Sequence, residues 1–302
     1  MRINIFEKVK YSIPFHYRKE QGMCLLVTLL LCYFVTLSCS NIDESERLIY
    51  VPPVEVQRAV LIEDFTGQAC VNCPTATAQI HELQQTYGED NIIAVAIHSG
   101  PFAHRRSNMS NDFLSDLGTV QGDEYYLHWG IEAQPGVKIN RGAPIYDTRQ
   151  YAALISEEMK KTSPEYIASI QATINTSEHN SSLEESDFIS VDVVPSAIDM
   201  PTDTRLQVWM IEDSINVEGG NRNYVQLLPN NASDYNYVHN HVFRASLTQD
   251  PYGDYLNTHQ TSYSYTLSIP NYWNKNQLSI VVFLWNNTDG VIEVKKTKII
   301  NN

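Results

Sequence analysis

This sequence of 302 residues is poor in cysteine and in basic side chains. It has five cysteines, and its 21 Lys and Arg stand against 35 Asp and Glu, which gives a formal net charge of −14. Such a charge repels phosphate backbones and argues against nucleic acid as a partner. The sequence also lacks a G-x-S-x-G motif, a phosphate-binding loop and a zinc-protease motif, so it predicts no cofactor and no metal site. It contains no internal repeat, heptad pattern or low-complexity tract.

The apolar run near the N-terminus is short. It covers the 14 residues 24–37, follows Arg18 and Lys19, and is too short to span a bilayer but typical of a signal-peptide core. It ends in LSCS at residues 37–40, which resembles a bacterial lipoprotein signal, where cleavage precedes a cysteine that is then acylated. We therefore expect a lipoprotein signal peptide at 1–38 and, at 39–55, a tether held to the membrane by lipid on Cys39. The alternative is an ordinary secretory signal cut nearby.

Three acids, Asp43, Glu44 and Glu46, closely follow this cysteine. An acidic run in this place resembles the surface-export signal of Bacteroidetes lipoproteins. The alternative is a plain solvated tether, because polar acidic segments stay disordered. The sequence thus predicts a protein that is lipid-anchored in the outer membrane and faces either the periplasm or the cell surface.

The hydrophobic pattern changes near residue 160 and predicts two domains, 56–162 and 163–302. In the first, continuous apolar runs alternate with helical periods, which is typical of an α/β sheet covered on both faces. The second has short strands between turns with Asn, Gly and Pro, which favours an all-β, immunoglobulin-like sandwich. In the first domain we expect strands at 59–65, 92–97 and 136–140, a helix from Cys73 or Pro74 to Tyr87, and further helices at 111–117, 123–129 and 147–161. In the second we expect strands at 166–174, 188–194, 205–212, 241–247, 262–269, 278–284 and 291–299.

The segment CVNC at residues 70–73 is the most informative motif. It follows an expected strand and opens an expected helix, which is typical of a thioredoxin-like redox site. Cys70 is then the candidate nucleophile, favoured as a thiolate by the helix N-terminus, and Cys73 the thiol that resolves the mixed disulfide. Asp64 lies six residues before Cys70, at the same offset as the buried aspartate of thioredoxin, which assists proton transfer. Pro135 precedes a short strand and occupies the place of that family's cis-proline, so the predicted catalytic set is Cys70, Cys73, Asp64 and Pro135.

Other features of this segment favour a second interpretation. Ala69 stands where thioredoxins usually have tryptophan, Val71 and Asn72 supply no positive charge to hold a thiolate, and Pro74 is unusual. The alternative is a structural disulfide, Cys70–Cys73, in an oxidising compartment. Because this bond closes a short loop, it would stabilise the folded state by only ~2 kcal/mol or less. Stabilisation alone is therefore a weak reason for its presence.

Four segments together resemble the Omp28-related outer membrane lipoproteins of Bacteroidetes. They are EDFTGQACVNCP at 63–74, AVAIH at 94–98, Pro135 with Asn140 and Arg141, and YVHNHVFR at 237–244. The resemblance covers nearly the whole chain after the signal peptide. It implies an outer-membrane lipoprotein with a thioredoxin-like domain and a β-rich C-terminal domain, and surface adhesion or receptor roles are proposed for relatives.

Two histidine pairs are weaker candidates. His239 and His241 would share one face of a strand, where two imidazoles can begin a metal site. Their acidic neighbours Asp250 and Asp254, and also His259, are near only in sequence, so a polar interface is the simpler interpretation. His98 and His104 flank the loop after the second strand, close to the expected redox face, where they either tune Cys70 or are simply solvated.

The second domain is rich in tyrosine. Most of these rings are expected to pack the sandwich, whereas exposed ones can stack on sugars or peptides. They are Tyr224, Tyr235, Tyr237, Tyr252, Tyr255, Tyr263, Tyr265 and Tyr272, with Trp273.

Two functions therefore stay open. One is a tethered thiol–disulfide oxidoreductase that acts on extracytoplasmic proteins. The other is a surface binding or adhesion lipoprotein with a protein, peptide or carbohydrate partner, in which Cys70–Cys73 stays oxidised. The fold alone does not decide between them.

Overall fold

A computed structural model describes residues 55–104, 117–162, 166–175, 187–196, 200–216, 224–257 and 259–301. The chain divides into two compact units, Met1–Ile49 and Tyr50–Asn302, and all described residues lie in the second. Several expected features lie outside the described residues. They are the signal peptide, Cys39, all but the last residue of the tether and most of the helix 111–117. In the described ranges, no helix is both long enough and apolar enough to cross a membrane.

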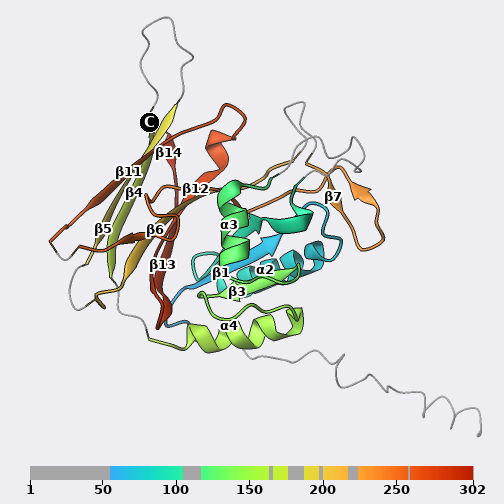
Figure 1. Cartoon of the computed structure of the whole chain (residues 1–302), viewed down its shortest axis with the longest axis horizontal. Coiled ribbons are helices and arrows are strands. Elements are labelled where there is room, and N and C mark those ends of the chain that lie inside the picture. Colours follow the sequence, from blue (N-terminus) through green and yellow to red (C-terminus); the bar gives the residue numbers. More distant parts are fainter. Residues whose placement is uncertain are drawn as a thin grey trace, which may run out of the picture. The chain divides into compact units, whose positions relative to one another are not determined.

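The centre of the fold is a sheet to which both halves of the chain contribute strands (Figure 1). β1 (Val60–Thr66) pairs in parallel with β2 (Ile92–His98) and antiparallel with β3 (Gly136–Ile139). The sheet continues from β2 to β9 (Val242–Ser246), with Ala96 opposite Val242. Beyond β9 it runs through β6 (Arg205–Glu212), β12 (Leu278–Asn286) and β13 (Gly290–Lys298), and β10 (Asp254–Tyr255) also pairs with β6. Backbone pairing therefore crosses residue 162, where the sequence predicts a domain boundary.

A second sheet packs on the C-terminal half of the first. Its order is β11 (Tyr263–Ser268), β5 (Phe188–Pro195), β4 (Ile167–Asn175) and β14 (Ile300–Asn301). Alternate residues of β5 and β6 point into the shared apolar core, among them Val191 and Val208, as the two-residue period of strands requires. The arrangement differs from the expected separate all-β domain, because one layer of this sandwich is the sheet that also contains β1 and β2. A small hairpin, β7 (Gln226–Leu227) with β8 (Ser233–Asp234), stands apart from both sheets.

Helices cover the two faces of the strands β1 to β3. α2 (Cys73–Tyr87) and α4 (Tyr151–Met159) pack on one face, where Val60 and Ile62 point. α3 (Val120–His128) packs on the other, against Leu61 and Phe65, and this core continues onto β6 and β12. The expectation of a sheet covered on both faces is thus confirmed.

Capping explains where the helices begin and end. Gly88, at φ +93°, ends α2. The Asp147 side chain accepts a hydrogen bond from Arg149 N at the start of a short 3-10 turn, Thr148–Gln150, so α4 itself begins only at Tyr151 and is shorter than expected. Two further 3-10 turns are Gly100–Phe102 and Lys275–Gln277.

Asn140, directly after β3 at one end of the sheet, is hydrogen-bonded to β13 at the other end and to β1. Its Oδ1 accepts from Leu61 N at 2.9 Å in β1, and its backbone oxygen accepts from Val291 N at 3.0 Å in β13. A Cβ atom at Gly290 would lie 2.2 Å from that oxygen, so only glycine allows the contact. The sheet therefore curls until its ends meet and encloses the core that contains Phe65 and Tyr125.

This enclosed core contains an ion pair. Arg141 Nε donates to Glu63 Oε1 at 3.4 Å and Arg141 Nη2 to Gln207 Oε1 at 2.7 Å, and all three side chains are buried. The guanidinium also lies over aromatic rings, 4.0 Å from the ring centroid of Trp285 and 4.8 Å from that of Phe283. Burial raises the pKa of Glu63, and the nearby positive charges of Arg141 and Lys138 oppose that rise.

Candidate functional site

Cys70 and Cys73 form a disulfide at the start of α2. The S–S distance is 2.05 Å and the Cα atoms are 5.4 Å apart. The loop that carries Cys70 follows β1 directly, and Cys73 N donates to Cys70 O at 3.3 Å. Pro74 lies in the first turn of the helix, where its missing N–H leaves no hydrogen bond unmade.

The disulfide is buried, and a segment from the second half of the chain is hydrogen-bonded to its loop. Cys70 is 3% exposed and Cys73 2% exposed. Residues 224–227, which we name the cover segment, carry Gln226, whose Nε2 donates to Cys70 O at 3.1 Å and lies 3.4 Å from Gly67 O. Because Gln226 is itself buried, these hydrogen bonds are shielded from water.

Gln68 fastens the same cover segment from the other side. Its backbone oxygen accepts from Leu227 N at 2.8 Å, and its Nε2 donates to Val225 O at 3.0 Å. Its Oε1 accepts from Leu117 N at 3.0 Å, which brings a third part of the chain to the cysteine loop. The cover is therefore attached by several buried hydrogen bonds, each of which would leave an unpaired polar group if broken.

Gly67 allows the cysteine loop to lie against the turn after β2. Ala69 N donates to Phe102 O at 3.0 Å, and a Cβ atom on Gly67 would lie 2.5 Å from the Phe102 backbone. A larger residue at position 67 would push the loop away. The backbone of the Cys70 loop is thus enclosed by both its flanking turn and the cover segment.

Asp64, on β1, is buried with one carboxylate oxygen unpaired. Thr77 Oγ1 donates to Oδ2 at 3.4 Å, whereas Oδ1 has no hydrogen-bond partner among the described residues. Burial raises the pKa of Asp64 to about 7, against the smaller effect of the Thr77 hydrogen bond. A carboxyl group that titrates near neutral pH beside the cysteine helix is suited to accept or donate a proton.

A cavity of about 280 Å³ lies beside this carboxyl group. Asp64, Thr77, Ile80 and His81 line it from β1 and α2, and Tyr237 and Val238 close it from the opposite side. Burial raises the pKa of Tyr237, which is also hydrogen-bonded to Thr77. The carboxyl group therefore faces a mostly apolar space rather than bulk water.

Pro135 lies where the loop before β3 meets the ends of β1 and β2. The Gln134–Pro135 peptide bond is cis. Gln134 Nε2 donates to Thr66 O at 2.8 Å and to Ser99 O at 3.0 Å, which fixes this loop at the carboxyl ends of the two parallel strands. The Cys70 loop leaves β1 at that end, so the four residues of the predicted set lie in one region of the fold.

The structure separates the histidines that a strand pattern would pair. His241 has φ +57° and precedes β9, so the expected strand starts one residue later and the alternation fails. His239 Nε2 lies 3.0 Å from Tyr224 O, whereas His241 Nδ1 lies 2.8 Å from Asp213 Oδ1. In the part of the chain that the structure describes, no group of three or more His, Cys, Asp or Glu side chains is arranged to hold a metal ion.

His239 instead packs with His98, with ring centroids 5.3 Å apart. Both rings are buried, which corrects the expectation that His98 is a loop histidine in solvent. Burial lowers the pKa of His239 to about 4, and burial together with the charges of His239 and Arg244 lowers the pKa of His98. His104 lies apart, 2.7 Å from Asp123 Oδ2.

Sequence reasoning does not identify the cover segment. Gln226 belongs to a two-residue strand between turns, where no periodic pattern marks it.

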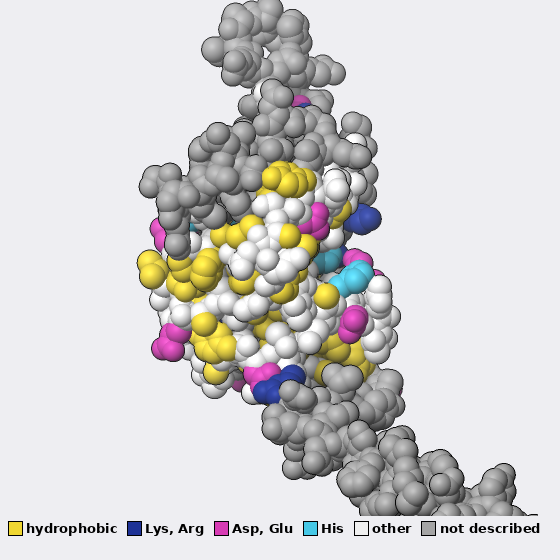
Figure 2. Space-filling model, turned by 90° about the vertical axis from the view of Figure 1, so that its right-hand side faces the viewer, with side chains coloured by type: hydrophobic (Ala, Val, Ile, Leu, Met, Phe, Trp, Pro, Cys, Tyr) yellow, Lys and Arg dark blue, Asp and Glu magenta, His cyan; other side chains and the backbone are white. Residues whose placement is uncertain are grey.

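Figure 2 shows the side of the molecule that lies at the right of Figure 1, where this hairpin and α2 are found. Hydrophobic side chains spread over the described part of that face, and basic ones lie at its edges.

The family described as outer membrane protein Omp28 matches residues 122–302. Among solved structures, HBP35 of Porphyromonas gingivalis is 15% identical, with a TM-score of 0.51 over 81% of this chain and 76% of that one. A domain of the outer membrane lipoprotein Omp28 from Porphyromonas gingivalis is 17% identical, with a TM-score of 0.27 over 44% of this chain and 95% of that one. No curated protein matches the chain. The likeness to HBP35 is one of fold, a mixed α/β arrangement with several sheets.

Proposed function

The chain belongs to the Omp28 family of outer membrane proteins, and we propose that it is a lipid-anchored binding protein of the outer membrane in which Cys70–Cys73 is a structural disulfide. The thioredoxin-like half, 56–162, then serves as a scaffold, and the β-rich half, 163–302, supplies both the cover and the partner surface. We assign the lipid to Cys39, and Cys39→Ser is expected to abolish incorporation of labelled palmitate.

The burial of the disulfide carries this proposal. Thiol–disulfide exchange requires a thiolate to approach one sulfur along the S–S axis. The cysteines are 3% and 2% exposed, and Gln226 and Gln68 fasten the cover segment over them through buried hydrogen bonds. The two cysteines therefore present almost no surface to a macromolecular substrate in this conformation. A disulfide in this environment is typical of a structural role.

Asp64 favours thiol–disulfide exchange as a second candidate function. In such a cycle the Cys70 thiolate would attack a substrate disulfide, forming a mixed disulfide and releasing one substrate thiolate. Cys73 would then lose its proton to Asp64 and attack Cys70 Sγ, which closes the Cys70–Cys73 bond and releases the second thiolate. Each turn oxidises the pair, so an external dithiol protein must return two electrons, and the cover segment must open twice.

Trapping of mixed disulfides distinguishes the two functions. Cys73→Ser leaves Cys70 free to form a mixed disulfide that no second thiol resolves, and Cys70→Ser is the matched control because it removes the expected nucleophile. Cells that express each variant are quenched with acid, alkylated and analysed on non-reducing gels. We expect the two variants to give the same pattern. Adducts that appear with Cys73→Ser alone would overturn the structural role and support exchange.

A further inference from the structure

An open cavity of about 660 Å³ lies beside β10 and β11, in the second half of the chain. It is lined by carboxylate, amide and phenol side chains. Gln249 and Asp250 come from the loop that leads into β10, Asp254 and Tyr255 from β10 itself, and Gln260 and Tyr265 from the region of β11. None of these residues belongs to the disulfide site or to the cavity beside Asp64.

Tyr255 presents a firmly supported aromatic ring to this cavity. It is 59% exposed, yet its backbone pairs with Arg205 of β6. The Arg205 guanidinium carbon lies 4.0 Å from the centroid of the ring, and Nη2 donates to the Tyr255 hydroxyl at 2.7 Å. The cation on one side of the ring fixes its orientation and leaves the remaining surface open to solvent.

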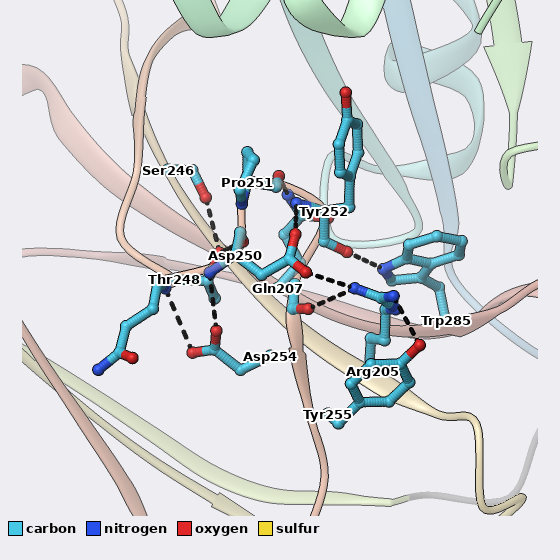
Figure 3. Close-up of polar contacts among 12 residues, drawn as sticks. Arg205, Gln207, Ser246, Thr248, Asp250, Pro251, Tyr252, Asp254, Tyr255 and Trp285 are labelled. Atoms are coloured by element: carbon cyan, nitrogen blue, oxygen red, sulfur yellow. Dashed lines mark hydrogen bonds and ion pairs between the residues drawn. The ribbon is translucent and has the colours of Figure 1, made fainter. Parts of the chain in front are cut away.

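Arg205 is held in turn by the loop. Its Nη1 donates to Asp250 Oδ2 at 2.9 Å and to Gly253 O at 3.1 Å, and Figure 3 shows it between the Asp250 carboxylate and the Tyr255 ring. Gly253 has φ +99°, and a Cβ atom there would lie 2.9 Å from Leu206 O, so the turn requires glycine. The support of Tyr255 is therefore built into the fold before any ligand arrives.

The same loop orients the polar groups of the cavity. Asp254 Oδ1 accepts from Asp250 N at 3.0 Å, and Asp254 Oδ2 accepts from the Tyr265 hydroxyl at 3.1 Å. Thr248 Oγ1 donates to Asp250 O at 2.9 Å (Figure 3). A fixed carboxylate with acceptor capacity to spare, beside the exposed side chain of Gln249, matches the hydroxyl groups of a sugar.

A second, more apolar cavity of about 340 Å³ adjoins the first. Tyr255 and Gln260 line both cavities, while Met200, Pro201 and Leu256 line only the second. An extended ligand that crosses Tyr255 would thus meet hydrogen-bonding groups on one side and apolar groups on the other. Sugar rings have this character, because their C–H faces are apolar and their edges carry hydroxyl groups.

We propose that Tyr255 is the stacking platform of a binding site for neutral oligosaccharides, with Asp254, Gln249 and Gln260 as hydrogen-bonding partners. Arg205 offsets the charge of Asp250, so the Asp254 carboxylate and the net charge of −14 are what select against uronic and sulfated sugars. This inference rests on the proposed binding function and names its ligand class. It does not depend on the redox state of Cys70–Cys73.

The test uses the full-length protein on an array of neutral, uronic-acid and sulfated oligosaccharides, followed by titration calorimetry with the strongest neutral ligand. We expect binding to neutral glycans that Tyr255→Ala weakens by roughly tenfold or more, whereas Tyr255→Phe keeps the ring and most of the affinity. Tyr272→Ala is the matched control, because Tyr272 is 52% exposed outside both cavities. Thermal unfolding verifies that each variant is folded, and Gln260→Ala tests the site independently if Tyr255→Ala unfolds.

Two results would overturn the inference. One is the absence of binding to every neutral oligosaccharide on the array, and the other is binding that both Tyr255→Ala and Gln260→Ala leave unchanged. Neither result bears on the structural disulfide, which the trapping of Cys73→Ser tests separately. Failure of the sugar site and failure of the proposed function are therefore distinguishable.

Discussion

The side-chain amide of Gln226 donates a 3.1 Å hydrogen bond to the backbone oxygen of Cys70, which lies 156 residues earlier in the chain. This bond joins the β-rich half of the protein to the loop of its only described disulfide. It means that the environment of the cysteines is set by a segment that no thioredoxin-like pattern includes. Access to the sulfurs therefore depends on the stability of the cover segment.

The first prediction concerns Gln226→Ala. The variant leaves Cys70 O without its buried donor, so we expect a loss of about 1–3 kcal/mol in the free energy of unfolding and faster reduction of the disulfide by dithiothreitol. The matched control is Gln85→Ala on the exposed surface of α2, which removes an amide of the same size that bonds to His81. Urea unfolding and thiol labelling measure the two effects. Equal reduction rates in wild type and Gln226→Ala would show that the cover does not protect the bond.

The second prediction concerns pH and Asp64. The pKa of Asp64 is about 7 in the folded protein and near 4 in an unfolded chain, so the folded state holds a proton that the unfolded state has lost. Stability from this group is complete below pH ~4 and is lost as the pH rises through ~7, by roughly 4 kcal/mol. We expect Asp64→Asn to remove this component. Unfolding free energies at several pH values measure it, and identical slopes for variant and wild type would contradict the account.

The third prediction concerns His239, whose pKa is lowered in the folded protein, whereas that of Asp64 is raised. Its pKa of about 4 in the folded state lies below the ordinary value near 6.5, so its stabilising contribution is present above pH ~6.5 and is lost as the pH falls through ~4. The loss amounts to roughly 3 kcal/mol. We expect His239→Gln, which keeps a donor for Tyr224 O, to flatten the acid limb of the stability curve. Unfolding free energies measured between about pH 3 and pH 8 follow this limb, and an acid limb that His239→Gln leaves unchanged would rule out this contribution.

The fourth prediction concerns the buried pair of Glu63 and Arg141. Arg141→Met leaves an uncompensated buried carboxyl group and is expected to destabilise by about 3–5 kcal/mol, whereas Arg141→Met combined with Glu63→Gln should recover part of that loss. Arg149→Met removes one partner of the exposed pair with Asp147 and should have a much smaller effect on stability, because solvent screens that pair. A double variant less stable than Arg141→Met alone would argue against charge burial as the cause.

Much of the local structure is predictable from the sequence, because the spacing of apolar residues along each segment shows which of its faces are buried. β6 has the predicted bounds, 205–212, since its apolar residues Leu206 and Val208 to Ile211 are buried on both faces. α2 begins at Cys73, as Pro74 near the first helical position predicts. The strands β7, β8, β10 and β14 are only two residues long and leave no periodic trace.

The pairing of distant segments is not predictable in the same way. A period shows that β9 is a strand, but its parallel contact with β2 rests on a single residue pair, Ala96 and Val242. The same holds for the candidate site. The motif at 70–73 identifies the cysteines, whereas their burial depends on Gln68 and Gln226, which are polar residues without a distinguishing pattern.

The claim that Cys70–Cys73 is a closed structural disulfide is tested most directly by its rate of reduction across a urea series. Dithiothreitol reduces the folded wild type, labelled thiols are counted by mass, and unfolding is followed by circular dichroism under the same conditions. We predict slow reduction without urea and a free energy of opening that falls with urea as steeply as that of global unfolding. Rapid reduction of the folded protein, independent of urea, would contradict the account and favour an exchanging thiol pair.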